Sequence, residues 1–82
     1  MFWVYIVECS DGSLYTGWTV NLEKRIAEHN RGEGAKYTRS RYPVILRYSE
    51  KHAARREAMQ RECCLKRLTR KEKLELINLY NT

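Results

Sequence analysis

The shortness of the chain constrains its fold more than any other feature. Its 82 residues leave room for one domain, residues 1–82. A domain of this size buries only about 60–65% of the surface that its unfolded chain exposes. With 43% hydrophobic residues, the chain can still form a core without covalent staples. The three cysteines are odd in number and two are adjacent, which argues against a disulfide framework, and the lack of a CxxC pair argues against a structural zinc site.

Positive charge is concentrated in the middle of the chain. Lys and Arg number 16 against 10 Asp and Glu, which gives a net charge of +6. Residues 1–23 contain no base, whereas residues 24–73 hold all 16 of them. Such a block is typical of a protein that binds a polyanion, although a merely well-solvated surface has a similar composition.

The sequence predicts no membrane partner. Crossing a bilayer takes about 20 apolar residues, and no run in the chain approaches that length. The N-terminus carries neither the basic region nor the cleavage site of a secretory signal. Together with the unpaired cysteines, these features predict a cytoplasmic protein.

The predicted elements follow the order strand, strand, helix, loop, strand, helix, helix. Strand residues cover 2–8, 14–18 and 44–49, and helical spacing with caps covers about 22–31, 52–67 and 69–80. Strands with helices laid over a face indicate an α/β or α+β layer sandwich. With so few residues, we expect only one face of the sheet to be well covered.

The first hairpin has two candidate registers. A two-residue turn at Asp11-Gly12 sends Tyr5 and Tyr15 to opposite faces of the sheet. A three-residue loop or a bulge, with Gly12 in the left-handed conformation, places both on one face. The sequence leaves both registers open. Buried strand tyrosines are ordinarily core residues whose hydroxyl is satisfied nearby.

Glu62 is out of place on the predicted second helix. Its spacing puts the carboxylate on the apolar stripe that includes Ala58 and Met59. Since burying an unpartnered carboxylate is costly, Glu62 must be paired, bound to a cation or placed at a cleft. An ordinary salt bridge to Arg25 or Arg61 is the alternative to a metal site.

Arg25 and His29 stand four residues apart on the predicted first helix. They flank the apolar positions Leu22 and Ile26, so both lie along the border of the buried stripe. Two such residues ordinarily lie at the solvent-exposed edge of a helix. The alternative is that they form a functional site there.

Several short motifs together resemble the GIY-YIG nuclease superfamily. Val4-Tyr5-Ile6 is followed by Tyr15-Thr16-Gly17, and Arg25 comes eight residues after the glycine. The segment Glu57–Glu62 is similar to the helix that ends in the superfamily's metal-binding glutamate, and Gly34–Arg39 resembles a loop of small stand-alone bacterial members. The resemblance covers the whole chain. It implies an α+β fold of order ββαβαα, with a three-stranded antiparallel sheet flanked by helices.

The resemblance also implies which residues form the site. Tyr5 and Tyr15 match the two active-site tyrosines, Arg25 the catalytic arginine, His29 a position that is often His or Tyr, and Glu62 the divalent-metal ligand. Gly17 matches the motif glycine. The chain departs from the family pattern in its first tripeptide, VYI, and in Trp18, where excision-repair relatives have lysine.

These matches predict an endonuclease that hydrolyses DNA in repair or recombination and depends on Mg²⁺ or Mn²⁺, with RNA as an alternative substrate. Glu62 would hold the ion, and Arg25 would contact the scissile phosphate. Tyr15 is the hypothesised base, with Tyr5 as its partner and His29 assisting. The alternative is a nucleic-acid-binding module that keeps the fold and cuts nothing.

The loop after the first helix mixes cations with aromatic rings, as clamps on nucleic-acid backbones do. Residues expected to contact nucleic acid are Lys36, Tyr37, Arg39, Arg41 and Lys66. A solvated connector has a similar composition. Because no feature indicates readout of a base sequence, targeting would come from DNA shape or from a protein partner. We expect a monomer or a weak dimer.

Overall fold

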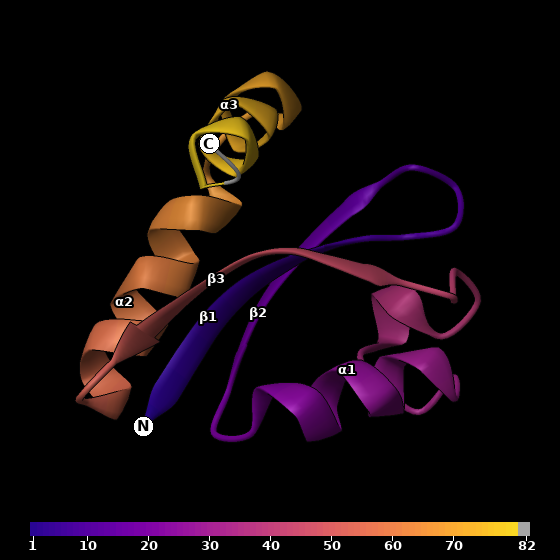
Figure 1. Cartoon of the computed structure of the whole chain (residues 1–82), viewed down its shortest axis with the longest axis horizontal. Coiled ribbons are helices and arrows are strands. Elements are labelled where there is room, and N and C mark those ends of the chain that lie inside the picture. Colours follow the sequence, from indigo (N-terminus) through magenta and orange to yellow (C-terminus); the bar gives the residue numbers. More distant parts are fainter. Residues whose placement is uncertain (81–82) are drawn as a thin grey trace.

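The computed structural model of the chain describes residues 1–80. In chain order the elements are β1 (Phe2–Glu8), β2 (Leu14–Thr19), α1 (Leu22–Asn30), the 3₁₀ turn η1 (Lys36–Thr38), β3 (Ile45–His52), α2 (Arg55–Lys66) and α3 (Arg70–Tyr80) (Figure 1). This is the predicted α+β fold with its elements in the predicted order. Within residues 1–80, no helix has the length and hydropathy of a membrane span.

The strands form one antiparallel sheet of order β2-β1-β3, so β1 lies at its centre. Helix α1 lies against one face, and α2 and α3 lie on the other side (Figure 1). The predicted three-stranded sheet flanked by helices is confirmed. Both faces carry a helix, and the face under α1 is the less well covered of the two, since Leu46 on it is 39% exposed.

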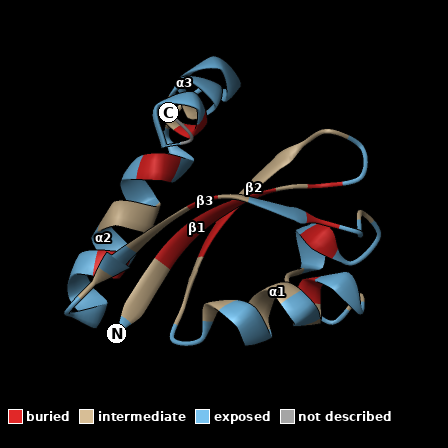
Figure 2. Ribbon diagram, viewed as in Figure 1, coloured by how far each residue is buried: buried red, intermediate tan, exposed pale blue. Residues whose placement is uncertain are grey.

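The sheet separates two hydrophobic cores. On the α2–α3 side the buried residues are Val4, Ile6, Tyr48, Ala58, Leu65 and Ile77, and on the α1 side they are Tyr5, Val7, Cys9 and Val44. Alternate residues of β1 therefore point into the two cores, and the middle of this strand is buried on both faces (Figure 2). This double burial accounts for the apolar run in β1.

The hairpin between β1 and β2 adopts the register that puts both tyrosines on one face. Its loop closes with the amide of Cys9 donating to the carbonyl of Ser13 at 2.8 Å, and Gly12 sits at φ 85° in the left-handed region. Tyr5 pairs with Gly17, which lies two residues after Tyr15 on β2. Both phenol rings therefore lie on the α1 face.

Two boundaries differ from the predictions by three residues, and one position that was predicted to be buried is exposed. Strand β3 runs on to His52, because its pairing with β1 continues to the end of that strand, and α2 begins only at Arg55. Met59 was expected on the buried face of α2 and is 45% exposed. Ala58 and Leu65, about two turns apart, face the sheet instead.

Helix caps follow the predicted pattern and fix where α1 and α3 begin. The side chain of Asn21 accepts a hydrogen bond from the amide of Lys24 at 3.1 Å, which starts α1. Thr69 and Glu72 form the predicted capping box of α3, with side-chain-to-amide distances of 3.2 and 2.8 Å.

Candidate active site

His29 is wholly buried near the end of α1 and makes contacts through both ring nitrogens. Its Nε2 lies 2.9 Å from the hydroxyl of Tyr5 on β1, and its Nδ1 lies 2.7 Å from Oγ1 of Thr38 in η1. Burial lowers the pKa of His29, and the positive charge of Arg25 lowers it further, so the ring is neutral at neutral pH. Helical spacing predicts only a border position, and the loop that packs on the ring completes its burial.

Two glycines make room for the Tyr5–His29 pair. A Cβ on Gly17 would lie 2.6 Å from the hydroxyl oxygen of Tyr5, and a Cβ on Gly34 would overlap the His29 ring. Neither glycine has a positive φ, so these positions require space and not a left-handed backbone. Gly17, the motif glycine, therefore leaves the space in which the phenol of Tyr5 packs against β2.

Arg25 reaches the same hydroxyl from one turn earlier on α1. Its guanidinium interacts with the hydroxyl oxygen of Tyr5, and its Nη1 donates to the Glu28 carboxylate at 3.1 Å. Burial raises the pKa of Tyr5 to about 12, although the contact with Arg25 lowers it. Tyr5 is therefore a neutral phenol held between a guanidinium and an imidazole.

Tyr15 packs beside this group through its ring. The ring meets His29 edge-on, with centroids 5.6 Å apart, and stacks on Tyr37 with centroids 5.9 Å apart. The guanidinium of Arg41 also lies over Tyr37, 4.2 Å from its centroid. Tyr37 thus has two partners within the protein and still keeps 42% of its surface exposed. Tyr15 stays half-buried, whereas Tyr5 is 1% exposed.

Glu62 approaches the group from α2, in the layer on the opposite side of the sheet from α1. Its side chain is 20% exposed. The negative charge of Glu62 contributes to the raised pKa of Tyr5, after the larger effect of burial, so the two side chains lie within electrostatic range. Glu62 therefore acts on the Tyr5 hydroxyl through its charge, from a helix on the other side of the sheet from α1.

The partner of Glu62 is a lysine on its own helix. Arg25 and Arg61, the expected salt-bridge partners, each pair with another glutamate, at 3.1 and 2.9 Å. The Nζ of Lys66 lies 3.6 Å from the Glu62 carboxylate. An i,i+4 pair of this kind contributes about 0.3–0.5 kcal/mol, so a competing cation can replace the lysine at little cost.

The donors around Glu62 suit a hard cation held by a single protein ligand. Within residues 1–80, no group of three or more His, Cys, Asp and Glu side chains is placed to hold a metal ion. Mg²⁺ commonly binds proteins through one or two carboxylates and fills its other positions with water and substrate phosphate. A partly exposed carboxylate with a weak lysine partner fits that arrangement, and Mn²⁺ accepts the same oxygen donors.

The loop cations expected to bind nucleic acid differ in how they are held. Arg41 is tied into the protein: its Nε lies 3.1 Å from the Asp11 carboxylate, and its Nη1 donates to the carbonyl of Tyr37 at 2.6 Å. Lys36 and Arg39 are exposed, and no ion pair within the described part of the chain includes them. These two side chains present free positive charge to solvent.

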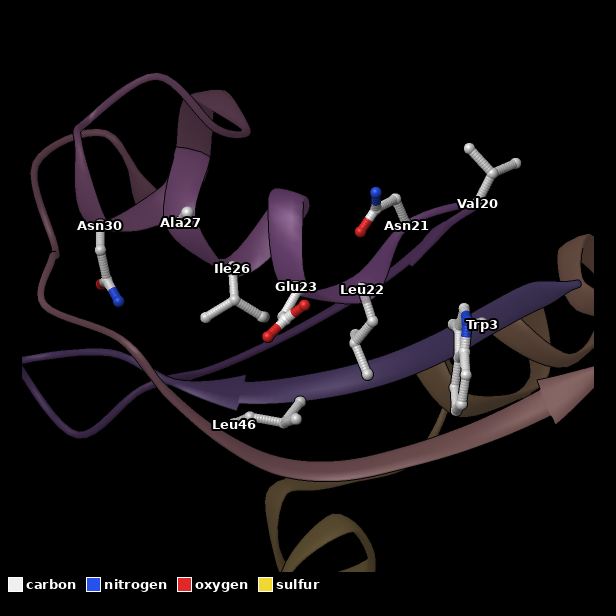
Figure 3. A pocket seen from close by; sticks show the side chains of 9 residues that line it. All are labelled: Trp3, Val20, Asn21, Leu22, Glu23, Ile26, Ala27, Asn30 and Leu46. Atoms are coloured by element: carbon white, nitrogen blue, oxygen red, sulfur yellow. The ribbon is translucent and has the colours of Figure 1, made fainter.

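Two grooves border α1. One, of about 500 Å³, opens beside Arg25 and is lined by the turn between β2 and α1 together with Lys24. The other, of about 650 Å³, is mostly apolar and lies on the β3 side of α1, where Leu22 points toward Trp3 and Leu46 (Figure 3). Only the first groove adjoins the group around Tyr5.

Sequence reasoning missed the two loop residues that contact His29. Gly34 and Thr38 lie in the segment that resembles the family's loop, and nothing in the sequence marks them as contacts of His29. No periodicity or spacing in an irregular loop indicates which of its residues will face a helix.

A family model for the GIY-YIG catalytic domain matches residues 1–78. The chain belongs to the GIY-YIG family. GIY-YIG relatives include a UPF0213 protein of Clostridium perfringens, 60% identical over 78 residues, which are 95% of this chain and 84% of the relative. A UPF0213 protein of Halobacterium salinarum is 53% identical over 73 residues, which are 89% of this chain and 95% of the relative.

Two solution NMR structures resemble this GIY-YIG chain. The UPF0213 protein of Bacillus halodurans superposes with a TM-score of 0.62 at 45% identity, over 96% of this chain and 85% of the other. A protein of E. faecalis superposes with a TM-score of 0.63 at 43% identity, over 96% of this chain and 84% of the other. Both agree with the fold described above, and the GIY-YIG family is one of nucleases.

Proposed function

We propose that the chain is a divalent-metal-dependent endonuclease that hydrolyses DNA phosphodiester bonds in repair or recombination. The observation that carries the proposal is the place of the Tyr5 hydroxyl, between the imidazole of His29 and the guanidinium of Arg25. The carboxylate of Glu62 is close enough to act electrostatically on the same hydroxyl. A phenol, an imidazole, a guanidinium and a carboxylate supply proton transfer, phosphate binding and cation binding.

Arg25 is the proposed ligand of the scissile phosphate. A guanidinium holds phosphate oxygens in a fork and stays charged at any physiological pH. Glu28 and Tyr5 each contact this guanidinium, which limits its freedom before substrate binds. The groove beside Arg25, with Lys24 in its lining, is the proposed place for the adjoining strand.

Tyr15 is the proposed base, with Tyr5 as its partner and His29 assisting. Tyr15 is half-buried and within reach of a water at the surface, whereas Tyr5 is almost completely buried. Tyr15→Phe tests the assignment: a variant that keeps near wild-type cutting across the pH range removes Tyr15 from this role.

Glu62 is the proposed ligand of the divalent cation. When bound there, the cation supplies neutralisation of the charge that develops on the phosphate. The contribution of the chain is a carboxylate held at the rim of the site, which exchanges its contact with Lys66 for the cation. Lys66, once released, is free to contact the DNA backbone.

The deciding experiment is cleavage of supercoiled plasmid and of branched oligonucleotide DNA, with Mg²⁺, with Mn²⁺ and with chelator. Wild type, Glu62→Ala and Glu75→Ala are compared, since Glu75 is an exposed glutamate of α3 and its replacement makes the same charge change. We expect metal-dependent cutting by wild type and Glu75→Ala, and none by Glu62→Ala. Cutting that survives chelation or the loss of Glu62 contradicts the proposal.

A binding module that does not cut is the second candidate. The ion pair between Lys66 and Glu62 favours it, because the proposed metal ligand already has a cation beside it. This candidate predicts no cutting in any of the conditions above. It also predicts equal affinity of wild type and Glu62→Ala for DNA or RNA, measured in chelator.

A further inference from the structure

The hydrogen bonds around His29 have only one consistent set of directions. Oγ1 of Thr38 lies 3.0 Å from the carbonyl oxygen of Ala35, which can only accept, so the threonine hydroxyl donates there. A hydroxyl has a single hydrogen. Oγ1 therefore offers only a lone pair to Nδ1 of His29, 2.7 Å away, and Nδ1 must carry a hydrogen and donate it.

The same reasoning continues to Tyr5. A neutral imidazole has one hydrogen, so with Nδ1 protonated Nε2 is an acceptor. The Tyr5 hydroxyl, 2.9 Å away, therefore donates to Nε2. The lone pairs of the Tyr5 oxygen are left for the guanidinium of Arg25. The donors thus run in one direction, from Tyr5 through His29 and Thr38 to the carbonyl of Ala35.

The loop holds Thr38 firmly in the position that this chain of donors needs. The amide of Thr38 donates to the carbonyl of Ala35 at 3.0 Å, and the carbonyl of Thr38 accepts from the amide of Arg41 at 3.0 Å. The Thr38 and His29 side chains are fully buried, so water does not replace either contact. Gly34 lets the backbone approach the ring closely enough for the bond to Nδ1.

We propose that Thr38 is a positioning residue that fixes His29 in its Nδ1–H tautomer and so keeps the Tyr5 oxygen available to Arg25. In the other tautomer, the hydrogen on Nε2 and the guanidinium would both donate to the Tyr5 oxygen. The phenol proton would then have to turn away from both donors, in a buried space. The tautomer stands on the geometry alone, and its effect on cutting rests on the proposed endonuclease function.

The test is ¹⁵N NMR of the imidazole rings in the wild-type chain at neutral pH, with His52→Gln used to assign the two histidines. We expect His29 to carry its hydrogen on Nδ1 and to have a bare Nε2. Thr38→Val keeps the shape of the side chain and removes the acceptor, so it should lose the Nδ1–H signal and gain Nε2–H. Thr38→Ser restores the hydroxyl and should restore the wild-type spectrum.

A wild-type His29 with its hydrogen on Nε2 overturns the proposal, and so does a Thr38→Val spectrum that keeps Nδ1–H. Should Thr38→Val fail to fold, Thr38→Ala removes the same acceptor without burying a new methyl group, and the same loss of Nδ1–H is expected. In the cleavage assay, Thr38→Val should cut more slowly at saturating DNA, with recovery in Thr38→Ser. A wild-type chain that does not cut contradicts the endonuclease function and leaves the tautomer measurement to decide the role of Thr38.

Discussion

The hydroxyl of Tyr5 lies where a side chain on Gly17 would begin. The two residues are cross-strand partners, and a Cβ on Gly17 would stand 2.6 Å from the hydroxyl oxygen and 2.8 Å from Cζ of the phenol. The absence of a side chain at this position is therefore what allows Tyr5 to reach His29.

Gly17→Ala should displace the phenol and break its bond to His29. We expect the free energy of unfolding to fall by about 1–3 kcal/mol, as overpacked sites do, and cutting to be lost. Urea unfolding measures the first effect. In a Tyr5→Leu background, which removes the colliding atoms, Gly17→Ala should cost much less. An equal cost in both backgrounds contradicts the steric explanation.

Replacing either of two buried threonines by valine should change the free energy of unfolding, in opposite directions. Oγ1 of Thr16 is buried without a hydrogen-bond partner in the described part of the chain, whereas Oγ1 of Thr38 bonds to both His29 and Ala35. Thr16→Val should raise the free energy of unfolding by about 1 kcal/mol, and Thr38→Val should lower it by about 1–3 kcal/mol. Denaturant unfolding of the two variants side by side checks this, and changes of the same sign would refute it.

Stability should fall as the pH is lowered through the range in which an unfolded histidine titrates. Burial lowers the pKa of His29 below its ordinary value of 6.5, so the unfolded chain binds the proton more readily than the folded chain. The stability from a neutral His29 is therefore complete above pH 6.5 and is lost as the pH falls through the folded pKa. The carboxyl groups with lowered pKa, Asp11 and Glu50, act at lower pH.

The comparison is made in a His52→Gln chain, where His29 is the single remaining histidine. Its unfolding midpoint should decrease between about pH 7.5 and about pH 5. Adding His29→Gln should flatten that dependence, whatever it does to the midpoint itself. If the pH dependence of the unfolding midpoint persists after the second substitution, it arises from another group.

Replacing the exposed Arg39 should change DNA binding, whereas replacing the ion-paired Arg41 should change stability. Arg39→Ala should weaken DNA binding and reduce the salt dependence of the binding constant by about one unit of slope. Arg41→Ala should lower the unfolding midpoint, because Arg41 joins the loop to Asp11 and to the carbonyl of Tyr37. An unchanged salt slope for Arg39→Ala would count against contact between this loop and phosphate.

Arg25→Lys tests whether the geometry of the guanidinium matters beyond its charge. Lysine keeps the positive charge but loses the fork that holds two oxygens. We expect cutting to fall by about 10²-fold or more, the usual loss when a preorganised donor is removed from a developing charge. Unfolding measurements run in parallel identify any loss of fold. Near wild-type cutting would show that a point charge is sufficient there.

Local signals in the sequence predicted those parts of the fold that depend on near neighbours. Strand Phe2–Glu8 and the caps at Asn21 and Thr69 were predicted where they occur, because their causes lie within a few residues. The end of β3 depends on pairing with β1, and the exposure of Met59 depends on which side of α2 meets the sheet. Contacts distant in sequence decide both, so local patterns could not predict them.

The sequence could predict which residues belong to the candidate site but not how they are arranged. The resemblance to a nuclease family pointed to Tyr5, Arg25 and Glu62, and in the structure both Arg25 and, more weakly, Glu62 act on the Tyr5 hydroxyl through their charges. The burial of His29 and its bond to Thr38 depend on how an irregular loop folds back on α1. The hairpin register depended on the conformation of Gly12, which the sequence allowed but did not require.

The division of the interior by the sheet has a consequence for how this protein can change over evolutionary time. His29 and Arg25 are carried by the helix on one core, and Glu62 by a helix on the other. Substitutions that repack the core under α2 can therefore shift the proposed cation ligand while the Tyr5–His29 pair stays intact. On the proposed function, descendants of one ancestor can therefore lose or regain cutting through substitutions in the α2 layer while the α1 layer stays unchanged.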